Sequence, residues 1–210
     1  MNNDYWLSAW QARVCRILPV FFLLIAALQA SSIGLAVVAP ELTAIEINCD
    51  KLRCGISGNP LLLLPSGTRE VVKASASAMA GYAAHLDLPA TRLMLMATEA
   101  LSNMPVVGLL MFVAAALQTL GHRGSTDLAR AIPWLRRASI AALIAVPLVP
   151  IGESLRTTVL LTAIEPERHF ALCVDVNRFI LNLFLAFAAF AVTWALAAGS
   201  RAGRDIAEIV

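Results

Sequence analysis

The sequence predicts an all-α integral membrane protein with four transmembrane helices, and two of its features carry this prediction. Of the 210 residues, 59% are hydrophobic and only 14% are charged, whereas soluble domains are about half apolar and a quarter charged. The apolar residues also gather into four long stretches, each close to the roughly 20 residues that cross a bilayer as a helix. A soluble fold of this length keeps about 30% of its unfolded surface exposed, which is too much for so apolar a chain.

We expect a single membrane domain over residues 1–210, with one long outer loop between the first and second spans. The expected spans are about 17–39, 97–120, 138–162 and 179–198, and the loop covers about 41–92. The loop is the least hydrophobic segment and contains turn signals such as Pro65–Gly67. Within it, Val71 to His85 predicts a helix rich in small residues. Pro89 is expected to end or redirect that helix.

The first apolar stretch has a second interpretation, a cleaved signal peptide. Arg13 and Arg16 precede it, and Ala30–Ser32 resembles a cleavage site. However, apolar residues resume after Ser32 and complete the length that a span needs. Leu28 is also a poor match to the small residue expected at the third position before a cut after Ala30. We therefore expect a retained membrane anchor.

The positive residues near the span ends predict that both termini lie in the cytoplasm, since orientation follows mainly from Lys and Arg in short links. The cytoplasmic segments would carry Arg13, Arg16, Arg123, Arg130, Arg136, Arg137, Arg201 and Arg204. The outer side has as many positive residues, but most belong to the long 41–92 loop, which counts less. Trp6, Trp10 and Trp134 suit an aromatic belt on the cytoplasmic side.

The short link from Gly121 to Arg137 is expected to contain a separate helix. Ser125–Asp127 could cap it, because Ser, Thr and Asp side chains accept hydrogen bonds from the first amides of a helix. Its apolar face, with Leu128 and Ile132, could lie on the membrane surface. The helix would end near Arg137, where the third span begins.

Polar residues near the outer ends of the last three spans form the candidate site. They are Glu99, Asn103, Glu153, Arg156, Arg178 and Asn182. Ionisable groups in lipid cost about 2.5–3.5 kcal/mol each, so they usually face protein or water. A rise of about 1.5 Å per residue puts all of them at similar depth, and Glu153 and Arg156 can pair at i, i+3. The cluster could be a small-ligand or ion pocket, but contacts between helices plus snorkelling are the favoured interpretation.

The cysteines are Cys15, Cys49, Cys54 and Cys173. Cys49 and Cys54 fall in the outer loop, where an oxidising periplasm could close a disulfide between them. Membrane enzymes that generate disulfides with a quinone need a CxxC pair and a second outer pair. Here the spacing is C-x4-C, and Cys173 stands alone on the outer side. A structural disulfide is therefore favoured over a thiol redox enzyme.

Other chemistry has no motif in the sequence. The histidines His85, His122 and His169 are scattered, and none pairs with carboxylates at metal-ligand spacing. We interpret each as a solvated or interfacial histidine. Hydrolase and nucleotide-binding motifs do not occur, and no basic run is typical of nucleic-acid binding. We expect no cofactor, no metal site, no nucleic-acid partner and no enzymatic activity.

Three stretches of the carboxy-terminal half carry a family resemblance: Leu109–Gly121, Gly124–Arg137 and Ala198–Val210. They give a span, a short link with a glycine and a Thr/Asp cap, an Arg-containing turn, and a tail after the last span. This half resembles the bacterial membrane proteins grouped as domain of unknown function 2975. Pro133, the long outer loop and the ending of the tail depart from the family pattern. The resemblance implies four helices in a bacterial inner membrane, and it implies no activity and no site residues.

Three functional hypotheses follow. The favoured one is a non-enzymatic helical bundle that binds a membrane protein, a lipid or further copies of itself, with the lipid bilayer as its surroundings. The second is a small transporter or channel subunit that uses the polar cluster, although the inner halves of the spans look apolar. The third is a periplasm-facing thiol redox enzyme.

Overall fold

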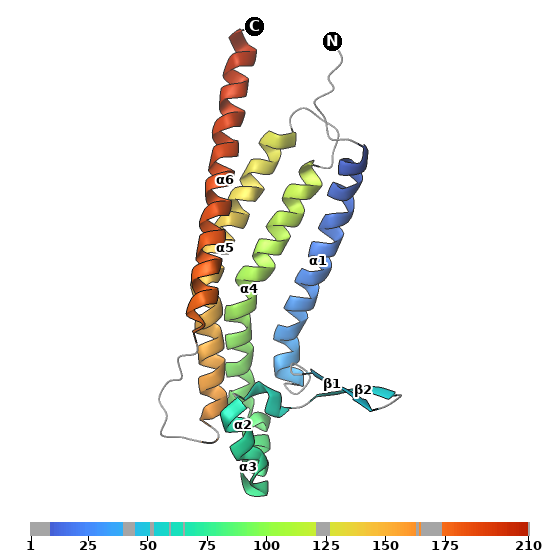
Figure 1. The fold of residues 1–210 in the computed structure, drawn as a ribbon, viewed down its shortest axis with the longest axis vertical. Helices are drawn as coiled ribbons and strands as arrows, with labels where there is room; N and C mark the ends of the chain where they lie inside the picture. The colour runs from blue at the N-terminus through green and yellow to red at the C-terminus, as the bar shows by residue number, and fades with distance from the viewer. Residues whose placement is uncertain are drawn as a thin grey trace. The chain divides into compact units, whose positions relative to one another are not determined.

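Four long helices form most of the structure, a computed structural model that describes residues 9–39, 45–50, 53–58, 60–64, 66–120, 127–162, 164 and 174–209. The helices are α1 (Ala9–Val38), α4 (Pro89–Leu120), α5 (Asp127–Leu161) and α6 (Val176–Ile209), shown in Figure 1. The segments long and apolar enough to cross a membrane are Arg16–Val38, Pro89–Leu120, Arg130–Leu161 and Val176–Gly199. Among the described residues, the prediction of four such helices is confirmed.

The chain divides into two compact units, and each is described by itself. The first comprises residues 1–29, 104–147 and 176–210, and the second comprises residues 30–103 and 148–175. Helices α1, α4 and α5 contribute to both units, whereas α6 belongs to the first.

All four long helices are longer than their expected spans, and α5 and α6 differ from them the most. The separate surface helix predicted within the 121–137 link is wrong, because α5 runs unbroken from Asp127 into the apolar stretch. Leu, Ala and Arg are good helix formers, and Pro133 does not end the helix, so this segment continues into the span. The tail after Ala198 is also helical as far as Ile209. No proline interrupts residues 199–209.

The segment expected as an outer loop contains regular structure, including a small β-hairpin beside the otherwise helical fold. Strands β1 (Ile45–Asp50) and β2 (Arg53–Gly58) pair in antiparallel fashion. Apolar and polar residues alternate over Ile45–Asn48, and this period of two is typical of a strand. The 3₁₀ helix η2 (Pro60–Leu63) and the helices α2 (Ser66–Lys73) and α3 (Ala76–Asp87) follow the hairpin.

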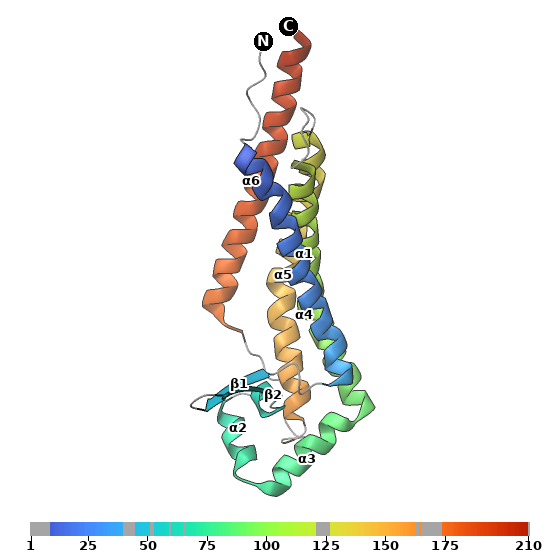
Figure 2. The ribbon, with the colours of Figure 1, turned by 90° about the vertical axis from the view of Figure 1, so that its right-hand side faces the viewer.

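The helix predicted over residues 71–85 is divided between α2 and α3. Ser75 interrupts it in an extended conformation, with φ −129° and ψ 119°, and its side chain accepts a hydrogen bond from the Ala78 amide at 3.4 Å. Ser is a preferred residue at this capping position because its short hydroxyl satisfies a first-turn amide. The chain turns there and again between α3 and α4 (Figure 2).

The second of these turns lies at Pro89, as the sequence predicts. Helix α3 ends at Asp87, Leu88 is extended, and Pro89 is the first residue of α4, a position that needs no amide hydrogen. The Arg92 side chain donates to the Leu86 carbonyl oxygen at 3.2 Å and to the Asp87 carboxylate at 2.8 Å. The bond to the Leu86 carbonyl supplies a partner that the last carbonyl groups of α3 lack within the helix.

Residues 60–88, which we call the cap, share an apolar core with one end of α4 and one end of α5. The core consists of Leu61, Leu64, Val72, Tyr82, Leu86, Leu95 and Leu160. Leu95 belongs to α4 and Leu160 to α5, while the others belong to the cap. Burying one such aliphatic side chain contributes about 1.5–3 kcal/mol, so this core holds the cap on the two helices.

Arg69 fixes the start of the cap. Its guanidinium group donates to the carbonyl oxygens of Leu61 at 3.1 Å, Leu62 at 3.4 Å and Leu64 at 3.1 Å. Carbonyl groups at a helix end need partners from outside the helix, and the planar fork of one arginine supplies several donors at once.

Candidate functional site

The candidate site begins with a close approach of α4 and α5 at Gly152. A side-chain carbon added at Gly152 would lie 3.0 Å from the Thr98 carbonyl oxygen and 3.1 Å from the Ser102 amide nitrogen. Real Cβ atoms seldom approach backbone atoms so closely, so the contact depends on glycine. Small residues allow membrane helices to pack with their backbones close together.

The hydroxyl groups around this contact are satisfied within their own helices. Ser102 donates to the Thr98 carbonyl oxygen at 2.9 Å, and Thr98 donates to the Leu95 carbonyl oxygen at 2.9 Å. On α5, the fully buried Ser154 donates to the Pro150 carbonyl oxygen at 2.7 Å. Burying a hydroxyl is costly unless it is hydrogen-bonded, so these bonds let small polar residues line an apolar contact.

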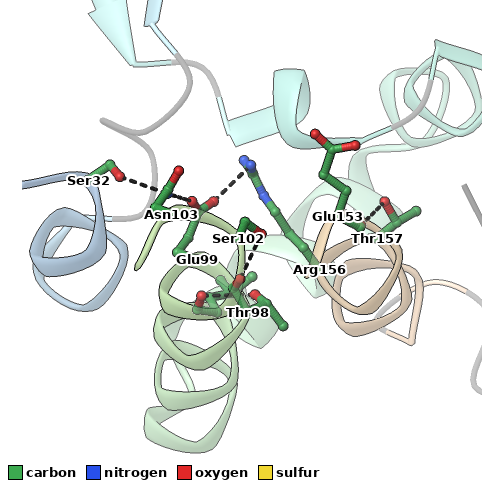
Figure 3. Close-up of polar contacts among 9 residues, drawn as sticks. Ser32, Thr98, Glu99, Ser102, Asn103, Glu153, Arg156 and Thr157 are labelled. Carbon is green, nitrogen blue, oxygen red and sulfur yellow. Dashed lines mark hydrogen bonds and ion pairs between the residues drawn. The ribbon is translucent and has the colours of Figure 1, made fainter. Parts of the chain in front are cut away.

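An ion pair joins α4 and α5 next to this contact (Figure 3). The Arg156 guanidinium lies 2.8 Å from Oε1 of Glu99, and the side chains are 30% and 11% exposed, respectively. The Asn103 amide nitrogen donates to Oε2 of Glu99 at 2.9 Å and to the Ser32 hydroxyl of α1 at 3.1 Å. Both carboxylate oxygens of Glu99 are therefore engaged, and the network links α1, α4 and α5.

Tyr82 brings the cap close to this network. Its side chain is 2% exposed. Burial raises the pKa of Tyr82 to about 12, and the positive charge of Arg156 lowers this pKa in part. The phenol is therefore neutral at physiological pH, and Arg156 acts electrostatically on both the cap and α4.

His85 is a second link between the cap and α5. Its Nε2 atom lies 3.3 Å from the Val159 carbonyl oxygen and 3.4 Å from the Thr91 hydroxyl. Because a carbonyl can only accept, Nε2 carries a hydrogen. His85 is half-buried and lies within hydrogen-bond distance of the end of α5 rather than fully solvated, and its interfacial location stays a prediction. His122 and His169 lie outside the described residues.

The structure brings three of the predicted cluster residues together, namely Glu99, Asn103 and Arg156. The expected pairing of Glu153 with Arg156 is replaced by the pairing of Arg156 with Glu99, while Glu153 is exposed. Arg178 and Asn182 lie on α6, which belongs to the other compact unit, and both are exposed there.

Sequence reasoning missed Ser32, Thr98, Ser102 and Gly152. For Ser102 and Gly152, the signal is their spacing relative to the charged residues. Ser102 is three residues after Glu99, and Gly152 is four residues before Arg156. Residues three or four apart lie on the same face of a helix, so small residues on the face of a buried charge indicate a close helix contact.

Cys49 and Cys54 lie directly opposite each other in the β1–β2 register. Opposed Cα atoms in an antiparallel pair are about 4.5–5.5 Å apart, within the range of about 4.4–6.8 Å that a disulfide spans. The backbone register is therefore compatible with the predicted disulfide, which stays a prediction.

The chain matches no family model, no curated protein and no solved structure. The resemblance to domain of unknown function 2975 stays a prediction. Among the described side chains, no group of three or more His, Cys, Asp or Glu residues is arranged to hold a metal ion.

Gly152→Ala is expected to destabilise the protein by about 1–3 kcal/mol, the usual cost of overpacking a tight contact. Gly81→Ala is the matched control, because a carbon added at Gly81 in α3 meets nothing within 4 Å. Alanine is about 1 kcal/mol better than glycine in a helix, so the control should leave stability unchanged or raise it. Thermal unfolding in mild detergent measures both variants, and equal effects would contradict the close contact.

Arg156→Ala is expected to lower the apparent Tm by about 5 °C or more, because it leaves the Glu99 carboxylate buried without its partner. Glu153→Ala removes an exposed charge three residues away on the same helix, and its effect on stability should stay within about 0.5 kcal/mol. A Tm loss from Glu153→Ala as large as that from Arg156→Ala would refute the assigned pairing.

Tyr82 is expected to ionise near pH 12 in the folded protein. The chain has two tyrosines, so Tyr5→Phe leaves Tyr82 as the single reporter in an ultraviolet titration of tyrosinate. Because the pKa of Tyr82 in the folded protein is raised above the ordinary tyrosine value of 10.0, the neutral phenol contributes its full stability below pH 10 and loses it as the pH rises toward 12. Ionisation of Tyr82 near the ordinary tyrosine pKa in the folded protein would contradict its burial.

Proposed function

We propose that the chain is a multi-pass protein of a bacterial inner membrane, with both termini in the cytoplasm, that acts as a non-enzymatic binding or regulatory helical bundle. Four apolar helices support the membrane location. The excess of arginine in the short segments around the helix ends supports the orientation. Under this topology the hairpin and the cap lie on the outer side.

The observation that carries the non-enzymatic proposal is the engagement of Glu99. One of its oxygens is paired with Arg156 and the other accepts from Asn103. A carboxylate with both oxygens engaged by its own chain is suited to holding helices together, whereas proton transfer requires an oxygen within reach of a substrate.

A binding role is supported by apolar side chains on the cap. Val71 of α2 is 63% exposed and Met79 of α3 is 42% exposed, both outside the membrane-spanning segments. A flexible methionine side chain adapts to different partner surfaces, so these exposed side chains are suited to contact with a partner. The partner would be a membrane protein or a further copy of this chain.

The second candidate function is that of a small transporter or channel subunit. One observation favours it: the Arg156 side chain remains 30% exposed beside Glu99. A partly exposed charge at membrane depth is typical of ion pathways. This function requires the ion pair to open or rearrange during transport.

Ion flux into proteoliposomes separates these two functions. The binding proposal predicts that vesicles containing the purified full chain take up protons, potassium and chloride no faster than empty vesicles. Glu99→Gln should leave this background rate of ion uptake unchanged. Uptake well above that of empty vesicles, abolished by Glu99→Gln and retained by the exposed-site control Glu153→Gln, would overturn the binding proposal in favour of transport.

The topology is tested by a membrane-impermeant maleimide on intact spheroplasts that express Cys15→Ser/Cys173→Ser, a variant that keeps Cys49 and Cys54. If Cys49 and Cys54 lie on the outer side and form the predicted disulfide, the maleimide should label neither of them before reduction. After reduction it should label both. Labelling without reduction would refute the disulfide but keep the orientation. Labelling only after the membrane is permeabilised would refute the orientation.

A further inference from the structure

Two arginines and a tryptophan share one face of α5. Arg130, Trp134 and Arg137 are spaced i, i+4 and i+7, which places them in one row along a helix. The Arg137 guanidinium carbon lies 4.8 Å from the centroid of the Trp134 ring. This is a cation–π contact, and both arginines are exposed.

The indole is itself held in place. The Phe112 ring of α4 packs against Trp134 with a centroid separation of 6.2 Å and an interplanar angle of 33°. Trp134 is half-buried between this ring and the arginine. An arginine restrained by a fixed aromatic ring has less side-chain freedom to lose when its free donors bind an anion.

Little acidic charge accompanies these arginines in the sequence. Asp127 is the only acidic residue between Glu99 and Glu153. Arg123, Arg130, Arg136 and Arg137 occupy the same stretch. Arg130 and Arg137 precede the apolar stretch that begins at Ala138, and polar headgroups meet the hydrocarbon of a bilayer near the ends of such stretches.

The row of arginines continues into an apolar surface. Ile140 and Ile144 follow Arg137 at i+3 and i+7, and they are 42% and 47% exposed. A ligand bound here therefore meets guanidinium groups first and exposed aliphatic side chains next along the helix. A phospholipid matches this order, because its charged phosphate is followed by apolar acyl chains. A free phosphate ion would contact only the guanidinium groups.

We propose that Arg130 and Arg137, arranged around Trp134, bind the phosphate of an anionic phospholipid, whose acyl chain lies along Ile140 and Ile144. The proposal rests on the proposed membrane location and adds a specific lipid site to it. Guanidinium groups bind phosphate through paired hydrogen bonds. Basic residues next to a span also attract anionic lipids.

The test uses the purified full chain in a zwitterionic detergent, with thermal unfolding as the readout of lipid binding. Phosphatidylglycerol, phosphatidylcholine and soluble glycerol phosphate are titrated separately. Phosphatidylglycerol should raise the Tm in a saturable manner and bind more tightly than phosphatidylcholine. Glycerol phosphate should produce no shift at the same concentrations.

Arg130→Gln/Arg137→Gln should weaken phosphatidylglycerol binding by about 30-fold, if each arginine contributes as a basic residue near a membrane surface usually does. Arg136→Gln is the matched control, because Arg136 is exposed but lies off the row formed by Arg130 and Arg137. It should retain most of the affinity.

Equal binding of phosphatidylglycerol and phosphatidylcholine would overturn the proposal, as would equal losses in the double variant and the Arg136→Gln control. A full shift with glycerol phosphate would replace the lipid by a free phosphate. These failures leave the membrane location intact. The proposed membrane location is tested separately, and it would be refuted if the chain were a monodisperse monomer in buffer without detergent.

Discussion

A carboxylate buried among apolar helices is stable only when its charge and both of its oxygens are satisfied. Glu99, 11% exposed, meets this requirement through the Arg156 guanidinium of α5 and the Asn103 amide, which in turn reaches Ser32 of α1. Unpaired in lipid, the same carboxylate would cost about 2.5–3.5 kcal/mol or more. The requirement therefore sets which faces of the helices meet.

The neighbouring contacts depend on this arrangement. Gly152 lets α5 approach the α4 backbone closely, one helical turn before Arg156. Tyr82 places the cap within the electrostatic reach of Arg156, and His85 bonds the cap to the Val159 carbonyl at the end of α5. The ion pair, the close helix contact and the cap therefore form one connected unit within residues 30–103 and 148–175.

The long helices were predictable because their signal is local: an apolar stretch of sufficient length is visible without any tertiary contact. Glu99 and Arg156 were also identifiable, since charges in apolar stretches are costly and therefore conspicuous. The choice of Glu99 rather than Glu153 as the partner of Arg156 was not predictable, because it depends on how α4 and α5 pack.

The small residues and the outer segment were also difficult to predict from the sequence alone. The structural role of Gly152 and Ser102 becomes visible only when α4 and α5 are packed together. The β1–β2 hairpin was overlooked because its strands are short and lie in a segment dominated by turn signals. The start of α5 was misplaced because the polar link and the span share helix-forming residues and the helix continues through Pro133.

A double-mutant cycle across the ion pair tests the central claim most directly. Glu99→Gln, Arg156→Gln and the double variant are compared with the parent chain by reversible unfolding in mixed micelles. Direct pairing predicts that the single losses together exceed the loss in the double variant, with a coupling energy of about 0.5–3 kcal/mol. Strictly additive losses would mean that Glu99 and Arg156 do not interact, and would contradict the account of how these helices are held together.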